Sequence, residues 1–288
     1  MANDLIDPYM QPGRDVLKNK LNVTNAEALS KFEYKASAFR AKELQANPIQ
    51  GNFDLDHLKA VHKKLFGDVY EWAGELRTVN ISKGGTSFTR NSQIEGYADK
   101  IHNDLLKDNL LKGLEKPQFV ERLSHYYAEL NTLHPFREGN GRATREFIGQ
   151  LAKQAGYELD QTRIDNEKGR WNEAARRSFS GDLEGVKQIF SEAVRPSRAV
   201  AFEHLTEQEA LKKHPELKPA YAGLQKVSES LNERFPGNEK AQQHYMLQAR
   251  SEVIRKLDTG KVLEPIKTQE PVKRQEIRQE PVRSGMSR

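Results

Sequence analysis

The chain has 288 residues, no cysteine and a formal net charge of +5. Without cysteine, a disulfide framework and a thiolate metal site are both excluded. No stretch approaches eighteen apolar residues in a row, which excludes a membrane-spanning helix. The N-terminus lacks the basic start and apolar run of a signal peptide. The length predicts between one and two domains.

The positive charge is spread along the chain rather than concentrated. Residues 196–262 hold eleven basic and nine acidic side chains, and residues 263–288 hold six and four, so one net charge remains for residues 1–195. A protein that binds a nucleic-acid backbone normally shows a concentrated basic face. We therefore expect no direct nucleic-acid partner and no membrane partner.

Residues 77–90 predict a β-hairpin. Arg77 to Ile81 alternates as a strand does, Lys83-Gly84-Gly85 is a turn signal, and Thr86 to Arg90 follows as the returning strand. An ordinary solvent-exposed hairpin explains this pattern equally well, so its function depends on the segments that follow.

Two helices are predicted on either side of a short loop. After Pro117, apolar residues recur at steps of three and four up to Leu133, and Pro135 ends the helix near His134. A second helical pattern begins near Gly141 and ends at Gly156. The motif between these limits is therefore a helix-loop-helix junction.

The junction combines groups that suit a nucleotide phosphate. The free N–H groups and positive end of the second helix point into the loop, where glycines let a phosphate approach the main chain. Arg142 and Arg145 share one helix face, so both guanidinium groups can contact phosphate oxygens. Glu138 is a carboxylate suited to Mg²⁺. His134 can accept a proton near neutral pH.

Each of these features also has a simpler explanation. A His-Pro pair caps a helix more often than it acts as a base, and Asn140-Gly141 is an ordinary turn dipeptide. An arginine pair is usually a solvated face. Their occurrence together within twelve residues reverses these odds. His62 and His125 lack metal-ligand spacing and are predicted to be structural.

The junction resembles the signature of the Fic (filamentation induced by cAMP) family, His-x-Phe-x-Asp/Glu-Gly-Asn-Gly-Arg-x-x-Arg, at every fixed position. The resemblance includes residues 55–66, a helix in the family, and residues 70–81, which lead into a flap. It covers about residues 5–195 and looks closest to the bacterial toxin branch. It implies a mostly α-helical Fic domain with a β-hairpin flap.

The resemblance also implies protein adenylylation, in which AMP passes from ATP to a hydroxyl of a target protein. His134 would deprotonate that hydroxyl, and Glu138 would hold Mg²⁺. Arg142 would bind near the β-phosphate and Arg145 near the γ-phosphate, beside an anion hole formed by Gly139, Asn140 and Gly141. The flap would pair with an extended segment of the target. Its residues are Lys83, Gly84, Gly85, Thr86, Ser87 and Phe88.

Regulation in this family often uses an inhibitory helix with the pattern Ser/Thr-x-x-x-Glu-Gly/Asn. Ser180 to Gly185 matches formally, but Glu184 lies in the first turn of a helix predicted over 181–193, where an acid simply complements the helix dipole. We therefore expect a separate small antitoxin to supply the inhibitory Glu to Arg145. The toxin branch suggests type II topoisomerase ATPase subunits as the target.

The chain after residue 195 has a different character. Polar helical patterns over 202–213, 218–234 and 239–257 predict a small helical module within 196–262. Residues 263–288 repeat a Glu-Pro theme with few apolar residues and are predicted to be a disordered basic tail. Such appendages resemble those of conjugation or type IV secretion proteins, although a solubilising linker explains them equally well.

The sequence thus predicts an ATP- and Mg²⁺-dependent adenylyltransferase of the bacterial cytoplasm, with delivery into another cell as a further expectation. Two alternatives stay open. The domain could transfer another group, such as UMP, phosphocholine or a phosphate. The chain could instead be a conjugation-associated interaction protein with an idle Fic domain.

Overall fold

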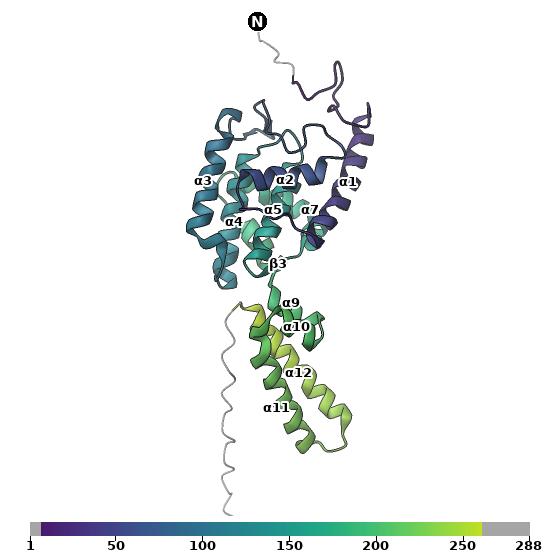
Figure 1. Cartoon of the computed structure of the whole chain (residues 1–288), viewed down its shortest axis with the longest axis vertical. Coiled ribbons are helices and arrows are strands. Elements are labelled where there is room, and N and C mark those ends of the chain that lie inside the picture. The colour runs from purple at the N-terminus through teal and green to yellow at the C-terminus, as the bar shows by residue number, and fades with distance from the viewer. Residues whose placement is uncertain (1–6, 261–288) are drawn as a thin grey trace, which may run out of the picture.

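Helices form most of the chain, in an N-terminal body and a C-terminal extension (Figure 1). The structure is a computed structural model and describes residues 7–260. Within that range, no helix is both long and apolar enough to cross a bilayer. The predicted mostly α-helical fold is confirmed.

The body contains eight α-helices, two 3₁₀ turns and two short antiparallel strand pairs within the described residues. In chain order these are α1 (Ala26–Ala46), α2 (Leu55–Phe66), β1 (Ser82–Lys83), β2 (Thr86–Ser87), η1 (Asn91–Gln93), α3 (Ile94–Lys107), η2 (Asn109–Leu111), α4 (Lys116–Leu133), α5 (Asn140–Gln154), β3 (Tyr157–Leu159), α6 (Gln161–Asn166), α7 (Lys168–Ser178), α8 (Glu184–Ala193) and β4 (Val194–Pro196).

Helices α4 and α5 pack against each other in the middle of the body, with α2 against α5 and α3 and α8 against α4. Pro117 lies in the first turn of α4, as predicted, and α5 begins at Asn140, one residue earlier than expected. Phe136, in the loop between them, is fully buried. This packing fixes the loop from both sides.

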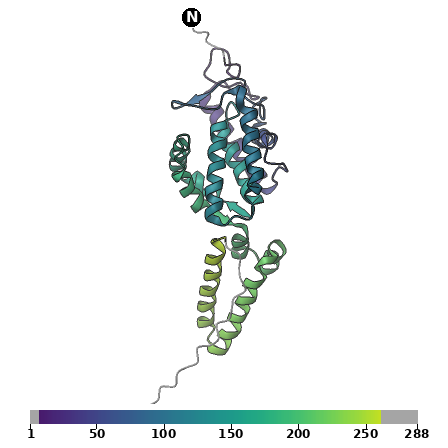
Figure 2. The same cartoon turned by 90° about the vertical axis from the view of Figure 1, so that its left-hand side faces the viewer.

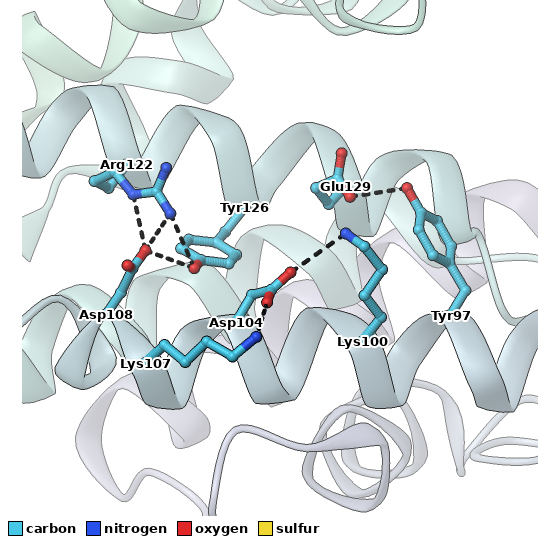
Figure 3. A network of polar contacts seen from close by, with 8 residues as sticks. All are labelled: Tyr97, Lys100, Asp104, Lys107, Asp108, Arg122, Tyr126 and Glu129. Atoms are coloured by element: carbon cyan, nitrogen blue, oxygen red, sulfur yellow. Dashed lines mark hydrogen bonds and ion pairs between the residues drawn. The ribbon is translucent and has the colours of Figure 1, made fainter.

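A polar network joins α3 to α4 (Figure 3). Asp108, which follows α3, accepts hydrogen bonds from Arg122 and, at 2.6 Å, from the Tyr126 hydroxyl. Burial and the neighbouring carboxylate raise the pKa of Tyr126 well above its usual range. Tyr97 and Glu129 add a second contact of 2.9 Å. The network thus connects α4 to α3 and to the residue that follows α3.

The hairpin is shorter than predicted. Only Ser82 to Lys83 and Thr86 to Ser87 pair as strands, around a turn in which Gly84 and Gly85 both have positive φ. Arg77 to Ile81 does not form a strand. Two of its carbonyl groups bind side chains instead, since Asn91 donates to the Thr78 carbonyl at 2.8 Å and the Arg77 guanidinium to that of Val79 at 2.8 Å.

The extension has a hydrophobic cluster of its own, centred on Phe202, Leu217, Leu224 and Leu257. Its elements are α9 (Ser197–His204), α10 (Glu207–Lys213), η3 (Pro215–Leu217), α11 (Lys218–Arg234) and α12 (Glu239–Asp258). Figure 2 shows α11 and α12 as a helical pair below the body, with the β1–β2 hairpin toward the far end.

The single helix predicted over 202–213 is wrong, whereas α11 and α12 lie where the sequence predicts them. The chain breaks at Leu205, which is extended, and restarts at Thr206. Thr206 and Glu209 form a capping box, a strong signal for a new helix start. The predicted tail over 263–288 lies outside the described residues.

Candidate active site

His134 caps α4 in an unusual backbone conformation. Its φ is 43° and its ψ 60°, in the left-handed region, where a residue other than glycine is held at a cost of about 1–3 kcal/mol. Its N–H still donates to the Leu130 carbonyl, at 3.2 Å. The chain leaves the direction of α4 at this residue. As a result, the imidazole and the start of α5 line the same cleft.

The imidazole of His134 is held in one orientation. Its Nδ1 lies 2.8 Å from the Asn131 carbonyl oxygen. Because a carbonyl only accepts, Nδ1 must carry the proton, which leaves the lone pair on Nε2. The ring of Phe88, from the hairpin, stacks on the imidazole with centroids 3.7 Å apart. His134 can therefore accept a proton through Nε2.

Burial keeps this imidazole neutral. It lowers the pKa of His134 to about 4, with the positive charges of Arg77 and Lys83 adding to the effect and the bond to Asn131 opposing it. At neutral pH the ring is therefore uncharged and available as a base.

The loop after His134 is closed by its own side chains and by α2. The Asn140 side chain accepts from the Phe136 N–H and donates to the Phe136 carbonyl, both at 2.8 Å. The Asn140 side chain therefore holds the loop closed across Phe136. His62, on α2, donates from Nε2 to the Glu138 carbonyl at 2.9 Å while its Nδ1 accepts from the Gly74 N–H.

Gly139 is required by space as well as by conformation. Its φ is 79°, and a Cβ placed there would lie 2.5 Å from the ring of Phe66. A Cβ on Gly141 would meet no atom within 4 Å. The first glycine therefore serves the packing of the loop, while the second leaves open space at the start of α5.

The two arginines on α5 have different surroundings. Arg142 is paired with Glu33 of α1, donates to Ser37 at 2.9 Å and lies over the Phe66 ring at 4.7 Å. Arg145 pairs with the exposed Asp165 at 2.6 Å. Arg142 is thus fixed by buried neighbours, whereas the partner of Arg145 is a surface carboxylate that a phosphate could replace.

Glu138 is exposed to solvent in the loop between α4 and α5. One of its oxygens accepts from the N–H of Gly139 at 2.9 Å. Within residues 7–260 it forms no ion pair, and no group of three acidic or histidine side chains there could hold a metal. A metal ion at Glu138 would therefore need further ligands from a bound substrate.

The predicted base, the predicted ATP-binding residues and Glu138 all line one cleft of about 680 Å³, together with Lys83, Gly84, Thr86 and Phe88 of the hairpin. Gly85 and Ser87 do not line it. A cleft of this volume suits a ligand the size of a nucleotide. The structure thus brings the loop, the imidazole and the hairpin to one place.

Two walls of the cleft were not predicted. Helix α1 contributes Ser30, Glu33 and Tyr34. Helix α7 contributes side chains three or four residues apart, which share one face of the helix. That face consists of Lys168, Asn172, Ala175 and Arg176, followed by Phe179. The helical spacing was present in the sequence, but a polar face is typical of a surface helix and does not by itself indicate a cleft.

The match to known proteins agrees with this geometry. The model of the Fic/DOC family matches residues 52–152. The chain is 43% identical over 188 residues to the probable protein adenylyltransferase Fic of Escherichia coli, covering 65% of this chain and 92% of that protein. This chain belongs to the Fic/DOC family.

Other Fic proteins extend the comparison. The protein adenylyltransferase VbhT of Bartonella schoenbuchensis is 47% identical over 162 residues, which are 56% of this chain and 34% of VbhT. The BepC protein of Bartonella tribocorum, a VirB-translocated effector solved with bound AMPPNP, has a TM-score of 0.62 and 28% identity. The match covers 65% of this chain and 96% of BepC. The predicted enzyme class, nucleotidyltransferase, is confirmed by these relatives.

Proposed function

We propose that this Fic protein transfers AMP from ATP to a hydroxyl side chain of a target protein. The observation that supports this most directly is the position of His134. Its free Nε2 faces the same cleft as the N-terminus of α5 and Arg145. A base and an anion site within one cleft are what attack on a phosphate requires.

In the proposed reaction, Nε2 of His134 takes the proton of the target hydroxyl. At the same time, the oxygen of that hydroxyl forms a bond to the α-phosphorus of ATP. The bond from that phosphorus to the bridging oxygen breaks, and pyrophosphate leaves. The N–H groups at the start of α5 and the Arg145 guanidinium stabilise the phosphate charge. Bound phosphates also raise the pKa of His134 from its low free value, which makes it a stronger base in the complex.

Magnesium belongs to the same proposal. Glu138 is the carboxylate of the motif, and Mg²⁺ sites that serve nucleotides use one or two carboxylates plus phosphate oxygens. The residues present therefore fit a nucleotide-dependent Mg²⁺ site held by Glu138. When bound, the ion would neutralise phosphate charge.

The hairpin supports a role in target binding. Lys83, Thr86 and Phe88 line the cleft beside His134, and the paired segment is short and exposed at its edge. An extended peptide that pairs with such an edge is fixed by main-chain hydrogen bonds. We propose residues 83–88 as the flap that brings the target hydroxyl to Nε2.

We also propose that a separate small antitoxin restrains the enzyme through Arg145. Glu184, the formal match to the inhibitory pattern, begins α8 with an 83% exposed side chain that pairs with Lys187 at 3.2 Å. In the described part of the chain, Arg145 pairs with Asp165 and not with a glutamate. If Glu184→Gln activated an otherwise silent protein, restraint would be internal and the antitoxin proposal wrong.

The experiment for AMP transfer uses bacterial lysate, Mg²⁺ and ATP labelled at either the α- or the γ-phosphate. We expect α-label on a protein band and none with His134→Ala. His125→Ala is the matched control, since His125 lies on the same helix against Tyr126, outside the cleft. Transfer of γ-label would indicate a kinase instead, and label from UTP alone another nucleotide donor.

The target and the place of action are further proposals. We propose type II topoisomerase ATPase subunits as the first targets to test, by adding them in purified form to the labelling reaction. We propose the bacterial cytoplasm as the compartment of the protein. We also propose that a type IV secretion system delivers it into another cell, because some solved relatives are VirB-translocated effectors. Unlabelled subunits, or no transfer of a reporter fusion into recipient cells, would contradict these proposals.

A further inference from the structure

Arg77 is a buried charge without an acidic partner. It is 2% exposed, and its guanidinium donates to three backbone carbonyls in the described chain and to no carboxylate. Burial lowers the pKa of Arg77, which reflects the unfavourable desolvation of its charge. An apolar side chain could fill this space more favourably, so packing alone does not account for an arginine here.

The three acceptors belong to three different segments. Nε donates to the His134 carbonyl at 2.8 Å and Nη1 to the Val79 carbonyl at 2.8 Å, in the segment that leads into the flap. Nη2 donates to the Thr89 carbonyl, where the flap ends. The backbone N–H of Arg77 adds a bond of 2.9 Å to Pro135. One side chain thus joins both ends of the flap to the turn that contains His134.

The flap is joined to α4 by a second contact. The N–H and hydroxyl of Thr89 both donate to the Thr132 carbonyl at 3.1 Å, one turn before the loop. Phe88 directly precedes Thr89, and its ring is stacked on the imidazole. The backbone of His134 is therefore bound from one side by Arg77, and its ring is covered from the other by the flap.

We propose that Arg77 is a positioning residue that holds His134 in its left-handed conformation and couples the flap to it. This inference rests on the proposed AMP transfer. When a target pairs with the flap, the ends of the flap can shift only together with the His134 carbonyl. Target docking and the orientation of the base are then linked through one guanidinium group.

The test compares Arg77→Lys and Arg77→Met with the matched control Arg122→Met in the full chain. Arg122 is also an arginine with hydrogen-bond partners, on the same helix as His134 but facing Asp108 (Figure 3). We expect both Arg77 variants to bind Mg²⁺-ATP within about twofold of wild type. Their transfer rate should fall on the order of 10- to 100-fold, as misplacement of a catalytic group by about 1 Å does.

Two readouts separate positioning from a general loss of stability. Hydrogen exchange at the Phe88 and Thr89 amides should quicken in both Arg77 variants and not in Arg122→Met. The acidic limb of the pH–rate profile should move to higher pH in Arg77→Met, because one of the two positive charges facing His134, Arg77 and Lys83, is lost. It should stay in place in Arg77→Lys, which keeps the charge.

Arg77→Lys decides the matter even if Arg77→Met does not fold. Lysine keeps the charge but cannot reach three carbonyls in a fixed fork. A wild-type transfer rate with unchanged flap exchange in Arg77→Lys would overturn the proposal. Hydrogen exchange needs no reaction, so this outcome is distinguishable from failure of the proposed function, in which wild type itself would transfer no AMP.

Discussion

The ring of Phe88 lies against the imidazole of His134, with the two planes only 12° apart and the centroids separated by 3.7 Å. Phe88 also contacts Phe179 edge-on, at 5.3 Å, so the flap touches the end of α7. The hairpin therefore covers one face of the imidazole. In the proposed reaction, a target that pairs with the flap would meet His134 beneath the same aromatic ring.

Replacing Phe88 should change the pH dependence of the enzyme. Burial is the main reason that the pKa of His134 is about 4, so Phe88→Ala should raise it toward 6.5. The acidic limb of kcat/KM, which reports the free enzyme, should then move upward from about pH 4. Phe88→Leu, which keeps the ring covered, should move it less. Superimposable profiles for wild type and Phe88→Ala would show that Phe88 does not control this pKa.

Stability should fall in mild acid because His62 is buried and neutral. Its side chain is fully buried, and burial lowers its pKa to about 4, with the Glu138 carbonyl opposing this shift. In the unfolded chain, the imidazole of His62 binds a proton near pH 6.5. Its contribution to the free energy of unfolding is therefore fully present above that pH and is lost as the pH falls toward 4. The loss approaches about 3 kcal/mol for this group alone. Urea unfolding at pH 7.5 and 5.0 measures it, and equal stability at both would contradict the assignment.

The two glycines of the loop should respond differently to alanine. Gly139→Ala places a methyl group against the Phe66 ring at a positive φ, so we expect a loss of about 2–4 kcal/mol of unfolding free energy. The methyl group of Gly141→Ala would meet no atom within 4 Å. This variant should therefore unfold at about the same urea concentration as wild type. Its methyl group should still weaken ATP binding at least tenfold. Calorimetric titration tests this, and unchanged affinity would place the phosphates elsewhere.

Removing the partner of Arg145 should strengthen nucleotide binding. Asp165 is 56% exposed and holds the Arg145 guanidinium at 2.6 Å. Its carboxylate competes with a phosphate for the same donors and repels it. Asp165→Asn should therefore lower the Kd for ATP about two- to fivefold at low salt, with a smaller gain at high salt because of screening. Weaker binding would mean that Asp165 instead orients Arg145 for the ligand.

Local signals in the sequence were sufficient for the centre of the site. Pro117, Pro135 and Gly156 delimit α4 and α5, because each restricts the backbone at its own position. The apolar spacing on each helix then fixes which face is buried. The junction between them was predicted for the same reason, to within one residue.

Long-range contacts account for what was missed. Glu33 is buried because Arg142, more than one hundred residues later, is its partner, and no local pattern indicates such a pair. Arg77 was assigned to a strand by its alternating neighbours, yet its guanidinium binds the carbonyls of Val79 and Thr89, one in each predicted strand. The face of α7 was not predicted, because the cleft that it lines exists only in the folded chain.

Helix α4 runs from beside the last described residue of the extension, Gly260, to the cleft. Its last turn leads into His134, while its first residue, Lys116, lies so close to Gly260 that a Cβ there would come within 2.8 Å of the Lys116 nitrogen. With 18 residues, the helix spans about 27 Å. A fluorophore or an affinity handle attached at the exposed side chain of Lys256, one turn before Gly260, would therefore stay clear of the cleft. It would also be near enough for energy transfer to report directly on a labelled nucleotide bound at the far end.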